Sequence, residues 1–248
     1  MNTILEAEKI VKVYNGSKVL REVSLTVSEG EFVAVMGQSG CGKSTLLYQI
    51  SGMDMPDSGE IYFNGKNLHT LREKELSELR LNNMGFVFQK ANLLRALSVR
   101  DNIVFPAYQA LKASPKELNA RAEKWMERTG ILSIADGDVR KISGGQQQRA
   151  AICRALMNEP QILFADEPTG ALNSSVTQEI MDIFNQINAE GTAILLVTHD
   201  GKVAARADRV IYLKDGMVED ELLLGKYDAE KLSERERKTA DWLKTMDW

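Results

Sequence analysis

Residues 37–45 read Gly37-Gln38-Ser39-Gly40-Cys41-Gly42-Lys43-Ser44-Thr45, and they match the phosphate-binding pattern G-x-x-x-x-G-K-[ST] at every fixed position. The apolar run Phe32–Met36 before them is typical of a buried strand, and Thr45–Ile50 after them follows a helical pattern. A glycine-rich turn that binds nothing is the alternative interpretation. Because strand, loop and helix stand in the required order, the sequence favours a phosphate-binding loop.

The chemistry of phosphate explains why these residue types occur together. Glycine lets the backbone curl so that successive N–H groups point at phosphate oxygens, and the following helix adds the positive end of its dipole. We expect Lys43 to reach the β- and γ-phosphates, and the Ser44 hydroxyl to coordinate a Mg²⁺ ion bound to the same oxygens. All nine residues of the loop are predicted nucleotide contacts.

Composition excludes several classes of protein. The chain has 248 residues and a net charge of −4, and its basic residues form no stripe that would indicate nucleic-acid binding. No apolar run approaches the roughly 20 residues that span a bilayer, and the N-terminus does not resemble a signal peptide. We therefore expect a cytoplasmic protein that meets the membrane only through a partner.

The two cysteines do not form a disulfide framework. Cys41 occupies a variable position of the phosphate-binding loop, and we interpret it as a small filler residue. The helix N-terminus beside it could lower the pKa of its thiol, which leaves oxidation as the alternative role.

Polar residues follow three predicted buried strands. Gln89 comes after Met84–Phe88, and Asp166 with Glu167 follows Gln161–Ala165. Ligands bind at the carboxyl ends of strands in open α/β folds. We expect Asp166 to belong to the Mg²⁺ shell and Glu167 to polarise the water that attacks the γ-phosphate. A solvated turn is the alternative for the acidic pair, and an ordinary loop residue is the alternative for Gln89.

A histidine occupies the same kind of position. His199 follows the predicted strand Ala193–Val197 and is one of two histidines in the chain. A lone histidine is usually structural, but its place at a strand end favours contact with the γ-phosphate.

Two further pairs of strands are predicted. Ile4–Tyr14 and Val19–Val27 alternate apolar and polar residues, which is a hairpin signal, and strands Arg209–Leu213 and Met217–Leu222 are joined by Asp215-Gly216. Tyr14, at the end of its strand, could present its ring to adenine. On this evidence alone, an ordinary half-buried aromatic residue is the favoured interpretation.

The segment from about residue 92 to residue 158 is predicted to be mostly helical, which indicates a subdomain inserted between strands. Within it, Ser143-Gly144-Gly145-Gln146 combines a serine N-cap with a glutamine three residues later. We expect a helix to begin here with its glycine pair exposed at the tip, and such a tip is a second anion site.

Residues 226–248 form a charged, helix-prone tail after residues 1–225. Trp242, Leu243 and Met246 give it an apolar stripe. Such a stripe most often packs on its own domain, and docking to a partner is the alternative.

Together these motifs resemble the nucleotide-binding subunit of an ABC transporter over about residues 4–218. The resemblance implies an α/β P-loop NTPase fold with a mixed sheet, an antiparallel β subdomain and an inserted helical subdomain. It identifies Gln89 as the Q-loop residue, the segment Ser143-Gly144-Gly145-Gln146 as the signature, Ala171-Leu172-Asn173 as the D-loop, and His199 as the switch histidine.

The resemblance also implies a mechanism. In this family two subunits pack head to tail, so that each ATP lies between one phosphate-binding loop and the partner's signature helix. It assigns adenine stacking to Tyr14, and contact with Mg²⁺ and the membrane partner to Gln89. Lys43, Glu167 and His199 are then the catalytic residues, and Ser44, Gln89 and Asp166 are the metal contacts.

Finer features resemble the macrolide-exporter and lipoprotein-release group, and within it the ATPases of bacitracin and lantibiotic resistance. The shared stretches are Gln89–Leu94, Gly145–Arg149 and Ala165–Leu172. This likeness implies a permease partner with an FtsX-like domain. One position departs from the family pattern, because the D-loop normally ends in Asp where this chain has Asn173.

Other ATPases remain alternatives. Soluble machineries such as iron–sulfur assembly share these motifs, whereas repair proteins need a long coiled coil for which the chain has no room. A scaffold that binds ATP without hydrolysing it is disfavoured by the complete catalytic set. A sugar-importer subunit usually carries a regulatory domain, which the roughly 30 residues after Val218 cannot form.

Overall fold

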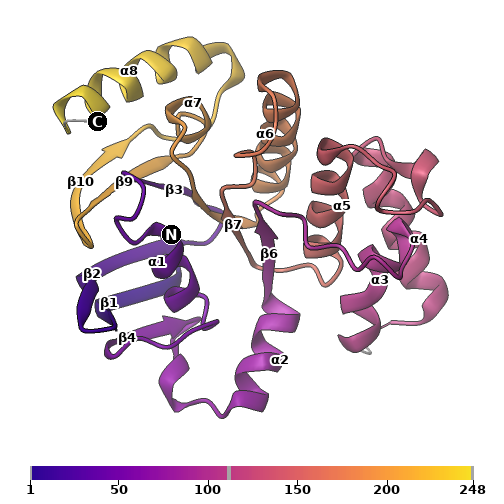
Figure 1. The fold of residues 1–248 in the computed structure, drawn as a ribbon, viewed down its shortest axis with the longest axis horizontal. Helices are drawn as coiled ribbons and strands as arrows, with labels where there is room; N and C mark the ends of the chain where they lie inside the picture. Colours follow the sequence, from indigo (N-terminus) through magenta and orange to yellow (C-terminus); the bar gives the residue numbers. More distant parts are fainter. Residues whose placement is uncertain (1, 111–112, 247–248) are drawn as a thin grey trace.

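The computed structural model describes residues 2–110 and 113–246. The last two residues of the predicted tail therefore lie outside the described residues. Two sheets and a group of helices make up the described chain (Figure 1). No helix in these two ranges is both long and apolar enough to cross a membrane.

An antiparallel sheet of four strands occupies one side of the molecule. Its strand order is β2-β1-β4-β5. The strands are β1 (Thr3–Tyr14), β2 (Ser17–Ser28), β4 (Ser58–Phe63) and β5 (Lys66–Asn67). The first two form the predicted hairpin, because Tyr14 pairs with Ser17 across a tight turn whose Asn15 has a left-handed backbone.

The central sheet has six strands in the order β10-β9-β3-β8-β7-β6. The pairs from β9 to β6 are parallel, and β10 is antiparallel to β9, so the sheet is mixed as predicted. The strands are β3 (Phe32–Met36), β6 (Met84–Phe88), β7 (Ile162–Asp166), β8 (Ala193–Val197), β9 (Arg209–Lys214) and β10 (Met217–Leu223). The middle strands β3 and β8 are buried along their whole length, which explains their continuous apolar sequences.

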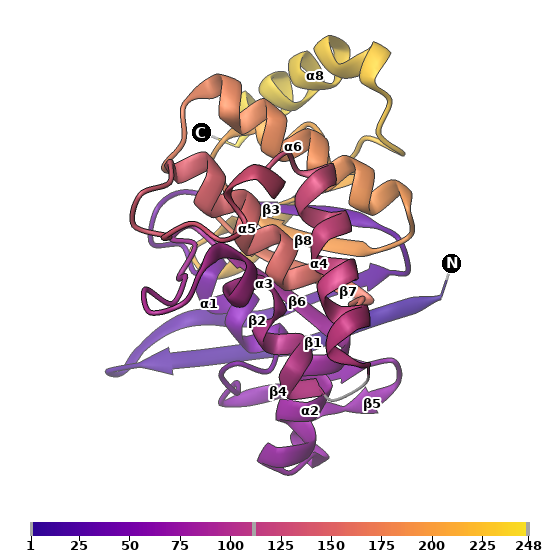
Figure 2. The same cartoon turned by 90° about the vertical axis from the view of Figure 1, so that its right-hand side faces the viewer.

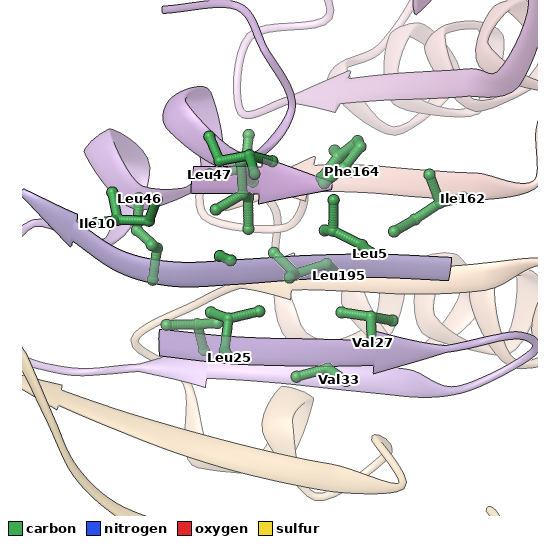
Figure 3. Close-up of a cluster of buried hydrophobic side chains, with 14 of the residues drawn as sticks. Leu5, Ile10, Leu25, Val27, Val33, Leu46, Leu47, Ile162, Phe164 and Leu195 are labelled. Carbon is green, nitrogen blue, oxygen red and sulfur yellow. The ribbon is translucent and has the colours of Figure 1, made fainter. Parts of the chain in front are cut away.

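The main core lies between the two sheets, where α1 (Lys43–Ile50) also packs. Figure 3 shows Leu46 and Leu47 of this helix gathered with Leu5 of β1 and Phe164 of β7. All four side chains are at most 1% exposed. The helix that follows the phosphate-binding loop is therefore fixed against both sheets by buried apolar contacts.

Helices cover the opposite face of the central sheet. They are α5 (Gly144–Leu156), α6 (Ser174–Ala189), α7 (Gly201–Ala204) and α8 (Leu232–Thr245). The tail helix α8 buries Leu243 in this second core, and the Trp242 indole packs edge-on against Tyr212. The apolar stripe of the tail thus packs on its own domain.

The predicted helical block stands at one end of the molecule (Figures 1 and 2). It contains α3 (Val99–Ala110), α4 (Pro115–Arg128) and α5, which share a third apolar core, and α2 (Glu73–Asn83) lies near its edge. Ser114 caps α4 in a capping box with Glu117. Short 3₁₀ turns occur at Leu68–Thr70, Leu132–Ile134 and Ala229–Lys231.

Candidate active site

Four parallel strands end at one edge of the central sheet, and this edge carries the predicted site residues. Phe88 pairs with Asp166, Asp166 pairs with Val197, and Val35 also pairs with Val197. Because these registers align the carboxyl ends of the strands, the residues that follow them meet in one place. The phosphate-binding loop, Gln89, Glu167 and His199 all leave the sheet here.

The phosphate-binding loop needs glycine at two positions, one for a close backbone contact and one for a backbone angle that side chains rarely adopt. A Cβ atom at Gly37 would lie 2.2 Å from the Leu213 carbonyl oxygen, so no other residue fits there. Gly42 has a φ of 106°, a conformation that side chains rarely adopt, and it directly precedes α1. The loop therefore presents the start of α1 with its backbone N–H groups free of intrahelical partners.

Lys43 lies folded over this loop. Its side-chain ammonium donates to the Gly37 carbonyl at 2.7 Å and to the Gln38 carbonyl at 3.0 Å, and the residue is only 8% exposed. The positive charge is held above the loop, where it can meet the terminal phosphates of a nucleotide.

Cys41 fills space behind the loop. A Cβ atom at Gly37 would lie 2.6 Å from the Cys41 sulfur, and the side chain packs against the main core. Burial raises the pKa of its thiol. Since the thiolate is the reactive form, this environment supports the filler role over oxidation.

Asp166 is linked to α1 by two hydroxyl groups. The Ser44 hydroxyl donates to its Oδ1 at 2.8 Å, and the Tyr48 hydroxyl donates to its Oδ2 at 3.0 Å. Burial, followed by the neighbouring Asp166 carboxylate, raises the pKa of Tyr48. Tyr48 was not predicted as a site residue. Its position four residues after Ser44 places it on the same helix face, and this spacing could have indicated its role.

These oxygen atoms fit a magnesium ion. Ser44 and Asp166 supply a hydroxyl and a carboxylate, which are the hard oxygen ligands that Mg²⁺ takes. Ser44 comes from the start of α1 and Asp166 from the end of β7, and the two side chains already lie within hydrogen-bond distance. Since Mg²⁺ takes six ligands, phosphate oxygens and water would supply the others.

Glu167 and His199 form a contact pair. His199 Nδ1 lies 2.8 Å from Glu167 Oε2. The Glu167 side chain is 18% exposed and that of His199 is 59% exposed, so the pair lies at the opening of the site. Glu167 has a left-handed backbone with a φ of 49°, and its N–H donates to the Val197 carbonyl at 3.0 Å.

The signature segment begins α5 as predicted. The Gln146 side chain accepts a bond from the Ser143 N–H at 2.9 Å, and the Ser143 hydroxyl accepts one from the Gln146 N–H at 3.3 Å. The expectation that both glycines are exposed is wrong for one of them. Gly144 is exposed, but Gly145 is half-buried, because a Cβ atom there would lie 2.7 Å from Val176 of α6.

Gln89 lies between the strand edge and α5. A Cβ atom at Gly170 would lie 2.9 Å from the Gln89 side-chain nitrogen, and both Gln89 and Gly144 line the same pocket. Gln148 of α5 donates to the Phe88 carbonyl at 3.0 Å and is 3% exposed. This second glutamine, which the sequence reasoning missed, ties the signature helix to the strand that carries Gln89.

Tyr14 lies across the first hairpin from a residue that lines the pocket beside the phosphate-binding loop. Ser17, its partner across the hairpin, lines this pocket of about 260 Å³ together with Lys18 and residues 38–41. The Tyr14 side chain is 43% exposed, and its hydroxyl donates to Asp54 at 2.6 Å. The ring is therefore held in place while much of its surface stays open.

A family model described as ABC transporter matches residues 20–170. The chain is 44% identical to the lipoprotein-releasing system ATP-binding protein LolD of Aquifex aeolicus, over 90% of this chain and 99% of that protein. It is 40% identical to the ABC transporter ATP-binding protein YxdL of Bacillus subtilis, over 91% of this chain and 89% of that one.

The chain also matches the macrolide export ATP-binding/permease protein MacB of Mannheimia succiniciproducens, with 43% identity, but it spans only 32% of that longer protein. Among solved structures, the ATP-binding cassette MJ0796, a dimer bound to ADP and Pi after hydrolysis, is 38% identical with a TM-score of 0.83. The match covers 90% of this chain and all of that one.

Proposed function

The chain belongs to the ABC transporter family as an ATP-binding and ATP-hydrolysing subunit, and we propose that it drives an FtsX-like permease in resistance to, or export of, antimicrobial peptides. The main support is the grouping of residues where the parallel strands end. There, the pair Asp166 and Ser44 and the pair Glu167 and His199 lie beside a complete phosphate-binding loop.

Each residue of the site has its own role in ATP hydrolysis. Lys43 and the N–H groups at the start of α1 bind the β- and γ-phosphates of ATP. Ser44 and Asp166 would hold Mg²⁺, with Gln89 beside them, and the ion would supply positive charge that offsets the charge of the phosphates. Glu167 accepts a proton from the attacking water, and His199 orients the Glu167 carboxylate and contacts the γ-phosphate.

The two anion sites support a homodimer. Within one chain, the phosphate-binding loop lines one pocket, whereas Gly144 of the signature lines another. The solved relative MJ0796 is described as dimeric. In a head-to-tail pair, Ser143, Gly144 and Gln146 of one copy would close over the ATP held by the other. ATP binding then favours the closed pair, and hydrolysis releases it.

Relatives support the membrane partner. The name of MacB includes both an ATP-binding and a permease part, and this chain spans about a third of that protein. LolD, by its name, is the ATP-binding protein of a lipoprotein-releasing system. We infer that a separate permease holds this chain at the cytoplasmic face of the membrane. Lipoprotein release is the second candidate function, because the LolD match extends over 99% of that protein.

Co-purification tests the partner. The tagged full-length protein is isolated from its native membranes, and the bound proteins are identified by mass spectrometry. We expect a permease with an FtsX-like domain and a large extracellular region. A permease of lipoprotein-release type would favour the second candidate. A conventional transporter channel, or no membrane partner, would contradict the proposal and favour an importer or a soluble machinery.

A further inference from the structure

Asp54, in the turn after α1, joins three side chains from β1 and α1 through one carboxylate oxygen. Its Oδ2 accepts bonds from the Tyr14 hydroxyl at 2.6 Å, the Lys12 ammonium at 2.9 Å and the Gln49 amide at 2.8 Å. Its Oδ1 accepts the N–H of Met55 at 2.9 Å, which fixes the orientation of the carboxylate. The network includes none of the phosphate-binding or catalytic residues described above.

Two members of this network are anchored in the core. Gln49 is fully buried, and the side chain of Lys12 is only 9% exposed. The Lys12 ammonium also donates to the Met55 carbonyl at 2.6 Å. A charge this far from water needs a partner, and Asp54 supplies the opposite charge. The Asp54 carboxylate is thus fixed by two buried side chains.

The third member, Tyr14, is fixed by its hydroxyl group and by a cation near its ring. Lys12 and Tyr14 lie two residues apart on β1, so their side chains share one face of the strand. The Lys12 ammonium lies 5.3 Å from the centre of the Tyr14 ring, within the range of a cation–π contact. The hydroxyl bond and the cation together fix the plane of a ring that is 43% exposed.

The hydrogen bond between Tyr14 and Asp54 is assisted by charge. This bond, with burial and the Asp54 charge, raises the pKa of Tyr14 to about 12. Burial alone would raise the pKa of Asp54, but the bonds from Tyr14, Lys12 and Gln49 lower it to about 2. At neutral pH the proton stays on the phenol and the carboxylate is ionised, which is the stronger form of such a bond.

Gln49 connects the network to the phosphate end of the site. It lies on α1 six residues after Lys43, roughly 9 Å along the helix axis. The turn that carries Asp54 is therefore built on the helix that starts at the phosphate-binding loop. The Asp54 carboxylate links the Tyr14 ring on β1 to the helix that follows the phosphate-binding loop.

We propose that Asp54 is a positioning residue for the base of the nucleotide, because it sets the Tyr14 ring at a fixed distance and tilt from the phosphate-binding helix. The inference rests on the proposed stacking of Tyr14 on adenine. A ring that is already oriented loses less freedom when the base stacks on it, so preorganisation increases affinity.

Steady-state ATPase kinetics with three variants test this role. Tyr14→Phe keeps the ring and removes the hydroxyl, and Asp54→Asn keeps the shape and removes the charge. We expect each to raise KM for ATP about three- to tenfold while kcat changes much less. The double variant should be no worse than the poorer single one, because both remove the same interaction.

A second measurement separates positioning from general damage to α1. Inorganic tripolyphosphate has no base, so its inhibition constant should be the same for Asp54→Asn and the unmodified protein. Glu60→Gln is a matched control, because Glu60 also accepts a tyrosine hydroxyl, that of Tyr62, on the antiparallel sheet. It should leave KM and kcat unchanged.

The outcomes distinguish failure of this inference from failure of the stacking proposal. Tyr14→Ala should weaken ATP binding about five- to a hundredfold if the ring stacks on adenine. If Tyr14→Ala weakens binding but Asp54→Asn and Tyr14→Phe do not, the positioning role is wrong. Equal losses of ATP and tripolyphosphate affinity in Asp54→Asn would also overturn it. If Tyr14→Ala has no effect, the stacking proposal itself fails, and the positioning role with it.

Discussion

Glu167 at the site adopts a backbone conformation that its residue type does not favour. Glu167 has a left-handed backbone, which costs a residue other than glycine about 1–3 kcal/mol. The bond from its N–H to Val197 and the contact with His199 hold it there. The sequence predicted Glu167 as the base from its place after a strand, but the backbone strain depends on β8, about 30 residues away, and no local pattern encodes it.

Asn173, which the family resemblance identifies as the end of the D-loop, has a structural role at the start of a helix. Its side-chain oxygen accepts the N–H of Val176 at 3.0 Å, so it is the N-cap of α6. Aspartate would keep this acceptor and add a charge that the helix N-terminus favours. We therefore expect Asn173→Asp to leave the free energy of unfolding unchanged or slightly raised. Because it restores the charge of the family pattern, we also expect it to alter the ATPase rate or its cooperativity.

The measurements are chemical unfolding and ATPase rate against ATP concentration. Asn173→Ala serves as the comparison, because it removes the cap and should cost about 1 kcal/mol of stability. An identical steady-state profile for Asn173→Asp and the unmodified protein would contradict the expectation that this position affects the ATPase rate or its cooperativity.

At the scale of elements, local signals predicted boundaries well and long-range contacts poorly. The capping box of α5 is as predicted, because Ser143 acts on a residue three positions away, and Ser114 caps α4 in the same way. The bond from Gln148 to Phe88 spans 60 residues and was not predicted. Arg154 makes a similar connection, donating to the Ala91 carbonyl at 2.7 Å and the Asn92 carbonyl at 2.8 Å. Both contacts tie α5 to the segment around Gln89.

The tail helix α8 is anchored by one arginine. The guanidinium of Arg235 donates to the carbonyls of Ala205 and Ala207, which follow α7, and to those of Leu224, Gly225 and Lys226. Arg235 is only 6% exposed, so its loss would leave several of these carbonyls without a donor. We expect Arg235→Ala to lower the free energy of unfolding by roughly 3 kcal/mol.

Denaturant unfolding with Arg237→Ala as the control checks this value. Arg237 lies two residues further along the same helix but is exposed, so its replacement should change stability by less than about 0.5 kcal/mol. Equal, small effects of the two substitutions would show that α8 contributes little to the stability of the fold.

At the scale of the whole molecule, the order of strands and motifs was predictable, whereas the way the parts meet was not. Continuous apolar runs such as Ala193–Val197 identify the buried parallel strands, and the residues after them identify the strand edge. The contact between Tyr48 and Asp166 and the network around Asp54 arise only when the two sheets close on α1. Each depends on residues that lie far apart in the sequence.

In the proposed mechanism, two copies of this chain close around ATP, and Glu167 then activates the water that hydrolyses it. Replacing Glu167 with Gln keeps the size of the side chain but removes the base, so ATP should bind and persist. Because ATP favours the closed pair, the variant should remain a dimer. Glu29→Gln, on the exposed turn before β3, is the control and should behave as the unmodified protein.

The most direct measurement is the molar mass of Glu167→Gln by size-exclusion chromatography with light scattering, with and without ATP. We expect a mass near that of one chain, 27.7 kDa, without nucleotide and twice that mass with ATP. A variant that stays monomeric with ATP at high protein concentration, or that hydrolyses ATP as fast as the unmodified protein, would contradict the assigned role of Glu167 and the shared site.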